Sequence, residues 1–302
     1  MSTIPICQYD AEVLSNRKIG PGLYWIDLLA PEITRHALPG HFVHLVASDV
    51  SEDSNRQTWL RHTPLLRRPF SIAERDPERG VFGLIYRIVG GGTEILATRR
   101  RGERVDVLGP LGRTFEPVRA GRPVIMVAGG VGVAPFLSLV QETARDGQAR
   151  LSEMTVLFGA ATAGLLSGEE KFREYGVGVR LATDDGTTGH HGLVTDLLER
   201  ELESSPRRCD FLYACGPTPM MRRCQEIARE SGIDGQVSLE GIMPCGVGVC
   251  MACVVACAAP GADPGADPGA DPGDDPGERS SSRRYERVCD AGPVFDMQEV
   301  VL

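Results

Sequence analysis

The sequence has no excess of positive charge. Its 32 lysine and arginine residues are outnumbered by 41 aspartate and glutamate residues, which gives a formal net charge of −9. Because phosphate backbones are bound by basic surfaces, this balance argues against nucleic acid as a partner. Residues 1–10 also lack the basic stretch followed by an apolar run that is typical of a secretory leader. We therefore expect a cytoplasmic protein that does not bind nucleic acid.

An uninterrupted apolar run of membrane-spanning length is missing as well. The longest candidate, residues 123–140, is broken at its centre by glycine and proline. A buried strand, a tight turn and a helix explain this pattern better than a membrane span does.

The cysteines do not form the pattern of a disulfide framework. There are nine of them, an odd number, in a long chain. Four lie within residues 245–257, and this crowding indicates metal chemistry in a reducing compartment.

What the sequence does contain is three regions with different patterns. Residues 1–118 hold short apolar or alternating segments separated by glycine and proline, which is typical of a small antiparallel β-barrel. The expected strands cover residues 13–19, 23–29, 41–46 and 83–89. A polar stretch at 48–63 is interpreted as a loop insertion.

Residues 119–233 alternate between buried strands and amphipathic helices. This alternation predicts a doubly wound, parallel α/β domain. The expected strands cover residues 124–128, 154–159, 179–183 and 210–215, and the expected helices cover 134–145, 167–175, 193–202 and 219–230.

Residues 234–302 form a third, small region with a cysteine cluster and a low-complexity repeat. The repeat is rich in Gly, Ala, Asp and Pro, which cannot bury a core, so we expect residues 260–282 to be a disordered insertion. The predicted fold class is therefore α+β and multidomain, with a barrel domain, an α/β domain and a small C-terminal domain.

The cysteine cluster has the spacing of an iron–sulfur site. Cys245, Cys250 and Cys253 follow the C-x4-C-x2-C pattern of a plant-type [2Fe–2S] site, which needs a fourth, distant cysteine. Cys289 is the only cysteine after the repeat and is the favoured fourth ligand. Cys257 is the alternative, although it lies only four residues beyond Cys253. A zinc site with the same thiolates is a further alternative, but zinc sites usually combine two C-x2-C pairs.

Two motifs in the barrel region indicate a flavin site. Arg68, Pro69, Phe70 and Ser71 form the first, in which the arginine can pair with a pyrophosphate and the serine can hydrogen-bond the flavin ring. The second, residues 90–93, precedes a helix and offers backbone amides to an anion. The alternatives are a strand with a surface arginine and a plain glycine turn that is capped by its threonine.

Two loops of the α/β region indicate a nicotinamide nucleotide. The first follows a buried strand and opens a helix, and its glycines would let a pyrophosphate approach the helix N-terminus. The second ends a strand at the carboxyl edge of the sheet, where ligands bind. A buried core thiol is the alternative for its cysteine. The residues concerned are Gly129, Gly130, Gly132, Pro135, Cys215, Gly216 and Pro217.

The sequence also predicts whether the protein prefers NADH or NADPH. A 2′-phosphate needs a cationic partner just after the second strand of the nucleotide domain. No lysine or arginine occurs between Gly159 and Gly168, and two glutamates follow. This pattern favours NADH over NADPH.

Taken together, these motifs resemble a known family. Residues 68–71, 129–135 and 215–217 are similar to the ferredoxin-reductase superfamily. The four cysteines, with the tail at 289–295, narrow the resemblance to the electron-transfer subunits of NAD-dependent, class B dihydroorotate dehydrogenases. It covers nearly the whole chain apart from the 48–63 stretch and the repeat. The long gap before Cys289 and the aromatic Phe70 depart from the family pattern.

The resemblance implies three cofactors and a partner. FAD would lie in the barrel, NAD would accept electrons at the α/β domain, and a [2Fe–2S] cluster would be held by Cys245, Cys250, Cys253 and Cys289. The partner would be an FMN-containing catalytic subunit, in a two-plus-two heterotetramer that serves pyrimidine biosynthesis. No catalytic acid or base is nominated in this chain. By position, the FAD contacts would extend to Ile85, Tyr86, Arg87, Gly92 and Thr93.

Two other functions stay open at this point. One is an NAD(P)H-dependent ferredoxin or sulfide oxidoreductase subunit of the same build. The other is a non-catalytic scaffold protein with structural zinc.

Overall fold

The computed structural model describes residues 5–46, 66–147, 150–204, 209–258 and 283–302. The expected insertion at 48–63 and the expected disordered repeat at 260–282 lie outside the described residues. Within the described part of the chain, no helix is long and apolar enough to cross a membrane.

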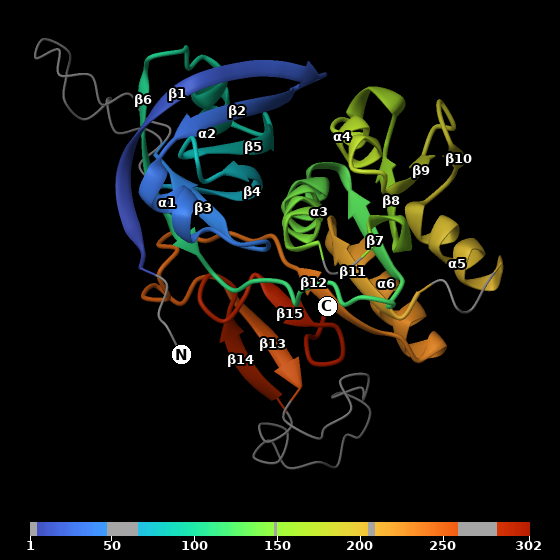
Figure 1. Cartoon of the computed structure of the whole chain (residues 1–302). Helices are drawn as coiled ribbons and strands as arrows, with labels where there is room; N and C mark the ends of the chain where they lie inside the picture. The colour runs from blue at the N-terminus through green and yellow to red at the C-terminus, as the bar shows by residue number, and fades with distance from the viewer. Residues whose placement is uncertain (1–4, 47–65, 148–149, 205–208, 259–282) are drawn as a thin grey trace, which may run out of the picture.

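The N-terminal part forms a closed barrel of six antiparallel strands, as predicted (Figure 1). Apolar side chains alternate inward along the strands, and Ala11, Val13, Ile26 and Leu28 are fully buried. The strand order is β1-β2-β5-β4-β3-β6, with β1 at Cys7–Gly20, β2 at Leu23–Leu29, β3 at Phe42–Leu45, β4 at Arg68–Asp76, β5 at Val81–Arg87 and β6 at Arg104–Leu111.

Two short helices accompany the barrel. The sequence pattern missed α1, Pro31–His36, which is shorter than two turns. It did anticipate α2, which covers Gly91–Ala97. The buried Leu96 of α2 packs into the barrel core.

The second part is a seven-stranded sheet whose first six strands are parallel (Figure 1). The strand order is β10-β9-β8-β7-β11-β12-β15, with β7 at Val124–Gly129, β8 at Met154–Ala160, β9 at Gly178–Thr183, β10 at His190–His191, β11 at Phe211–Cys215, β12 at Asp234–Ser238 and β15 at Val294–Asp296. The helices are α3 at Ala134–Asp146, α4 at Glu169–Glu174, α5 at Val194–Ser204 and α6 at Thr218–Ser231. Helix α3 lies between the sheet and the barrel, whereas α5 and α6 lie on the opposite face.

The sheet extends across the expected domain boundary at residue 233. Strand β12 pairs in parallel with β11, and β15, from the end of the chain, pairs antiparallel with β12. The cysteine-rich segment therefore leaves the sheet after β12 and returns to it at β15. The division into 1–118, 119–233 and 234–302 stays a prediction.

A hairpin explains how the long gap before Cys289 is accommodated. Strands β13, Val254–Ala258, and β14, Arg283–Arg287, pair antiparallel, with Ala258 opposite Arg283. Ala258 and Arg283, which flank residues 259–282 in the sequence, are thus neighbours in space. Lengthening a loop between fixed ends costs only about 0.6 kcal/mol per doubling.

Polar contacts fix the barrel against the α/β part. Arg75 of β4 is 8% exposed; its guanidinium donates to Glu142 of α3 at 2.6 Å, and its backbone N–H donates to the Gln141 side chain. Lys171 of α4 binds Glu74 at 2.7 Å. These contacts set the distance between the two parts of the molecule.

We expect Arg75→Met to lower the free energy of unfolding by about 1–3 kcal/mol, because it leaves the Glu142 carboxylate without its buried partner. Chemical denaturation of the purified protein measures this. The control is Arg35→Met, which removes an exposed ion pair with Glu32 and should cost less than about 1 kcal/mol. Equal losses for both variants would contradict a special role for the Arg75 contact.

Candidate functional site

A cavity of about 340 Å³ opens between the barrel and the α/β part, and we call it the barrel cavity. Residues predicted from the sequence to meet a flavin gather here from β4, β5 and α2. They are Arg68, Pro69, Phe70, Ser71, Ile85, Tyr86, Arg87 and Thr93. The opposite wall comes from Val131, Ala134, Leu239, Glu240, Gly241 and Met243.

Aromatic packing shapes the barrel cavity. Phe70 meets Tyr86 edge-on at 5.9 Å between ring centroids, and Tyr24 stacks on Tyr86 at 5.5 Å. The Tyr86 hydroxyl donates to the Asn16 side chain at 3.0 Å. Burial raises the pKa of Tyr86, so the ring stays neutral and its position is fixed.

The glycine turn before α2 is organised by Thr93. The Thr93 hydroxyl donates to the Gly90 carbonyl at 2.9 Å and accepts from the N–H of Val89 at 2.9 Å. The N-cap of α2 is Gly90, so Thr93 is not the N-cap considered from the sequence; it is the third helical residue, and its hydroxyl accepts from the N–H of Gly90 at 3.2 Å. Gly92 is buried behind the turn and does not line the cavity, whereas Gly90 and Gly91 have open space around them.

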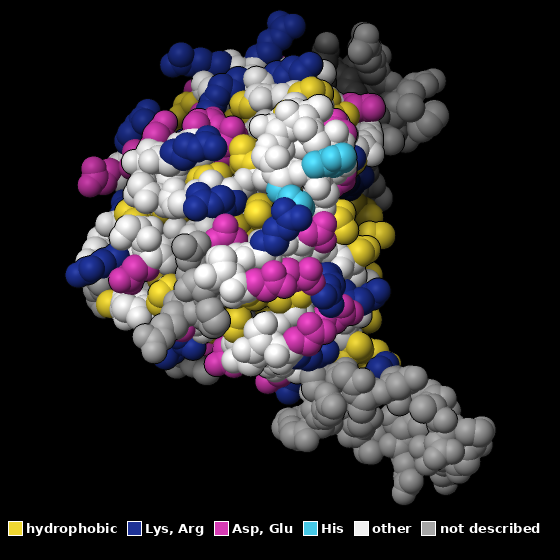
Figure 2. Space-filling view, turned by 90° about the vertical axis from the view of Figure 1, so that its right-hand side faces the viewer, with side chains coloured by type: hydrophobic (Ala, Val, Ile, Leu, Met, Phe, Trp, Pro, Cys, Tyr) yellow, Lys and Arg dark blue, Asp and Glu magenta, His cyan; other side chains and the backbone are white. Residues whose placement is uncertain are grey.

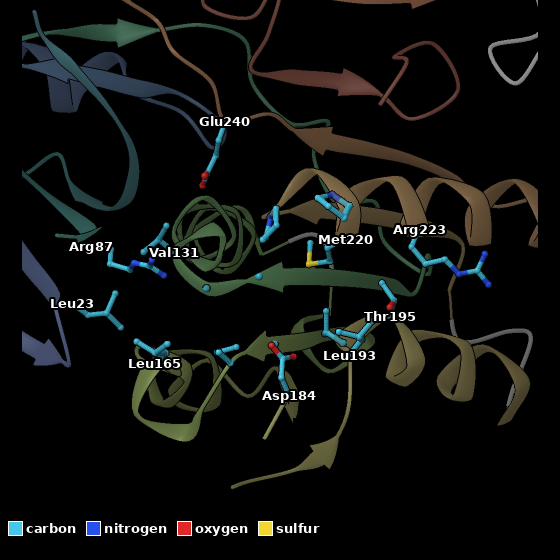
Figure 3. A pocket seen from close by; sticks show the side chains of 18 of the residues that line it. Leu23, Arg87, Val131, Leu165, Asp184, Leu193, Thr195, Met220, Arg223 and Glu240 are labelled. Carbon is cyan, nitrogen blue, oxygen red and sulfur yellow. The ribbon is translucent and has the colours of Figure 1, made fainter. Parts of the chain in front are cut away.

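A larger cavity of about 770 Å³, the sheet-edge cavity, lies at the carboxyl ends of the parallel strands (Figure 3). Gly129 and Gly130 line it after β7, Ala160 and Ala161 after β8, and Pro217 after β11. This is the edge at which open α/β sheets bind ligands.

Other predicted residues of this region lie behind the cavity wall. A Cβ on Gly132 would lie 2.3 Å from the carbonyl oxygen of Cys215, so only glycine permits this approach of the two loops. Pro135 is buried in the first turn of α3, as predicted. Cys215 is 1% exposed, and burial raises the pKa of its thiol well above the usual range.

The structure adds Glu240, which the sequence pattern did not single out. This residue follows β12 and lines both cavities, together with Arg87, Val89 and Val131 (Figure 3). Desolvation raises the pKa of its carboxyl group. No local motif marks this glutamate, because its partners come from β5 and from the loop after β7.

Asp184 is a second residue that the sequence pattern missed. It follows β9 and faces the sheet-edge cavity, and its N–H donates to the Ala160 carbonyl at 3.1 Å. Arg223 of α6 also lines this cavity. Its guanidinium, however, is bound to Glu199 and to Glu226.

Residues 245–253, the cysteine loop, connect β12 to β13 with unusual backbone angles. Gly246, Gly248 and Met251 have φ values of 71°, 75° and 58°. The N–H of Gly248 consequently points at Cys289 and donates to its Sγ at 3.2 Å. Such amide–sulfur contacts are typical of loops that wrap iron–sulfur clusters.

The four predicted ligands form two thiol pairs. Cys245 is hydrogen-bonded to Cys250, and Cys289 to Cys253. Burial acts to raise the pKa of Cys245, but hydrogen bonds from the backbone of Cys250 and Val247 outweigh it and lower the pKa to about 6. Burial, followed by the Cys253 side chain, raises the pKa of Cys289 to about 12, so the backbone favours the thiolate at Cys245 and not at Cys289. The four sulfur donors nevertheless fit a cluster bound by cysteine.

As the pairs stand, no three His, Cys, Asp or Glu side chains in the described segments are grouped closely enough to hold a metal ion. Cys257 lies elsewhere, fully buried in β13 opposite Arg284 of β14. Burial raises the pKa of its thiol.

The barrel, the parallel sheet and the two adjoining cavities define an oxidoreductase of the ferredoxin-reductase type. Residues 126–226 match the family model described as "Oxidoreductase NAD-binding domain". The full-length similarity is more specific. The chain belongs to the family of electron transfer subunits of dihydroorotate dehydrogenase B (NAD(+)).

Two curated relatives with that name support the assignment. The protein from Desulforamulus reducens is 38% identical over 247 residues, which covers 82% of this chain and 88% of that protein. The protein from Bacillus cereus (strain Q1) is 36% identical over 293 residues and covers 96% of this chain and 97% of that protein.

Solved structures support the fold. The structure of an NADH-dependent reduced ferredoxin-NADP oxidoreductase, described for flavin-based electron bifurcation, has a TM-score of 0.74 and 28% identity and covers 96% of this chain and 89% of that chain. The ferredoxin reductase in carbazole 1,9a-dioxygenase has 20% identity and a TM-score of 0.60, and the match covers 76% of this chain and 67% of that chain. This likeness shows the fold alone.

We expect Cys289→Ser to lose most of the bound iron, because its Sγ is held against Cys253 and Gly248 on the cysteine loop. The matched variant Cys257→Ser should keep the iron, because that thiol lies in the hairpin. Iron and acid-labile sulfide analysis of both purified proteins measures this. Loss of iron in Cys257→Ser but not in Cys289→Ser would show that Cys257, and not Cys289, is the fourth ligand.

We also expect the protein to prefer NADH, because Asp184 faces the cavity beside Ala160 and would repel a 2′-phosphate. Asp184→Ser should lower the preference, measured as kcat/KM for NADH divided by kcat/KM for NADPH, by about tenfold, which is roughly 1.4 kcal/mol. Steady-state dye reduction with each nucleotide decides it. Equal efficiency of the two nucleotides with the unmodified protein would refute the preference.

Proposed function

We propose that this chain carries electrons from a dihydroorotate-oxidising partner subunit to NAD+. A [2Fe–2S] cluster at the cysteine loop and FAD in the barrel cavity are the intermediate carriers. The reaction belongs to pyrimidine biosynthesis, and we place it in the cytoplasm.

One observation supports the proposal above all: the three candidate sites adjoin one another. The sheet-edge cavity and the barrel cavity share Arg87, Val131 and Glu240. Leu239, Glu240 and Met243 line the barrel cavity, and the chain reaches Cys245 two residues after Met243. A carrier in each site would therefore have the next carrier as its neighbour.

The proposed flavin contacts come from β4 and β5. Arg68 would pair with the pyrophosphate, and Ser71 would hydrogen-bond the flavin ring. The rings of Phe70 and Tyr86 shape the cavity wall, and Thr93 of α2 lines the same cavity, with Gly92 buried beside it. FAD, when bound, supplies two-electron chemistry toward NAD and one-electron chemistry toward the cluster.

The proposed nicotinamide contacts come from the two loops at the carboxyl edge of the sheet. Gly129, Gly130 and Pro217 would lie against the nucleotide, and Gly132, Pro135, Cys215 and Gly216 would hold the two loops together. Glu240 lies where the two cavities meet. Its carboxylate would favour the oxidised nicotinamide ring, which is cationic, over the neutral reduced ring.

The surface around the cysteine loop suits a protein partner. Ile242, Val249 and Met251 are 82%, 78% and 53% exposed, and Val247 and Val254 are exposed beside them. Contiguous exposed apolar side chains mark interaction sites. By contrast, acidic and basic side chains are interspersed over the face in Figure 2. We infer that the FMN-containing catalytic subunit docks on the apolar surface, in a two-plus-two heterotetramer.

A ferredoxin-linked function is the second candidate. It is favoured by the 28% identity to the NADH-dependent reduced ferredoxin-NADP oxidoreductase. The curated relatives at 36–38% identity favour the dihydroorotate function.

Reconstitution tests the proposal. The chain alone should reduce dyes with NADH, and together with a dihydroorotate dehydrogenase B catalytic subunit it should reduce NAD+ with dihydroorotate. Ile242→Asp should weaken the dihydroorotate-dependent rate at least tenfold by placing a charge in the docking surface, and it should leave NADH–dye reduction unchanged. The control is Ile6→Asp, a 53% exposed residue of the barrel region that should have no effect. Reduction of ferredoxin together with failure of every dihydroorotate assay would favour the second candidate.

A further inference from the structure

His44 of β3 is a buried polar side chain that nothing in the proposed electron route has used. Its side chain is 0% exposed. Among the residues that the structure describes, neither Nδ1 nor Nε2 has a hydrogen-bond partner. Buried polar groups without partners are costly, and they are rare in native proteins. The two ring nitrogens therefore need a hydrogen-bond partner that is not among the described protein atoms.

The cysteine loop lies directly against this ring. A Cβ placed on Gly246 would be 2.6 Å from His44 Cε1 and 2.7 Å from Nδ1, so the missing side chain of Gly246 is what lets the loop approach. Gly246 immediately follows the cluster ligand Cys245 in the sequence. The ring of Phe42 also lies beside it, with 5.6 Å between ring centroids, and offers no hydrogen bond.

The imidazole is neutral at physiological pH. Burial, and secondarily the charge of Arg67, lower the pKa of His44 to about 4. Arg67 itself is engaged by Asp106 at 2.6 Å. A neutral imidazole carries one N–H donor and one bare nitrogen. His44 therefore has an N–H to donate, and its side chain is buried.

We propose that His44 is a positioning residue for the cluster: its ring N–H donates a hydrogen bond to a sulfur of the [2Fe–2S] unit beside Gly246. The inference rests on the proposed function, because it requires the cluster at the cysteine loop. Thiolate and sulfide sulfurs accept hydrogen bonds, and hydrogen bonds to sulfur are among the means by which proteins set cluster potentials. Reduction adds negative charge to the cluster, so an N–H directed at sulfur stabilises the reduced state.

The same strand also reaches the flavin motif. In the β3–β4 register His44 lies opposite Pro69, and Phe42 lies opposite Ser71. Strand β3 thus stands between the proposed cluster and the proposed flavin site. A change at His44 would alter the cluster potential without removing any flavin contact.

The experiment is a redox titration of the purified holoprotein followed by electron paramagnetic resonance (EPR). His44→Phe fills the space but has no N–H donor. It should lower the reduction potential of the cluster by about 59 mV, which corresponds to a tenfold change in a one-electron equilibrium constant. His44→Asn and His44→Gln restore an N–H donor, and at least one should recover part of the shift. The control is His41→Asn, because His41 is buried but its Nδ1 already accepts from the N–H of Leu38 at 3.0 Å. It should leave the potential unchanged.

Iron and sulfide contents separate this inference from the proposed function. An unmodified protein without a cluster refutes the function itself, whereas a full cluster whose potential is the same in His44→Phe overturns only the role of His44. If His44→Phe does not fold, the unmodified protein labelled with ¹⁵N-histidine decides. Pulsed EPR of its reduced cluster should show a weak ¹⁵N coupling that His44→Asn lacks. No coupling, or the strong coupling of a directly coordinated imidazole, overturns the proposal.

Discussion

The antiparallel pairing of β15 with β12 is the interaction on which the arrangement of the sites depends. It brings residues near the end of the chain back beside the point where the cysteine-rich segment leaves the sheet, and the Leu239 N–H donates to the Pro293 carbonyl at 2.9 Å. The barrel joins the same junction, since the Arg113 N–H donates to the Gly292 carbonyl at 2.6 Å. Gly112 has no room for a side chain there, because a Cβ would lie 2.5 Å from the Pro293 ring. Barrel, sheet and cysteine loop are thus fixed to one another within a few residues.

This junction explains why Cys289 lies beside Cys253 despite the long sequence between them. The β13–β14 hairpin aligns the two strands, and the Val288 N–H donates to the Cys253 carbonyl at 2.9 Å. The last residues are anchored on α6, where the Gln225 side chain donates to the Val300 carbonyl at 2.7 Å. Because β13 and β14 are held in this way, the number of residues between them has little influence on where Cys289 lies.

Electrostatics distinguishes the two ends of the proposed electron route. At the sheet-edge cavity, Asp184 contributes negative charge, while Arg223 is bound to neighbouring glutamates. At the cysteine loop, backbone N–H groups point at the sulfurs of Cys245 and Cys289, and at Cys245 they stabilise the thiolate. One end therefore suits a nicotinamide that becomes cationic on oxidation, and the other suits an anionic iron–sulfur unit.

The sequence by itself determined most of what depends on spacing along the chain, although it did not mark the short helix α1. Alternating strands and helices predicted the α/β sheet, the C-x4-C-x2-C pattern marked the cysteine loop, and the glycines at 129–132 marked the carboxyl edge, because periodicity and loop geometry are local properties. Only the tertiary structure decided what is non-local. It placed β15 in the sheet, Glu240 between the cavities and His44 beneath Gly246. Each of these depends on contacts between residues far apart in the chain, and such contacts leave no periodic trace in the sequence.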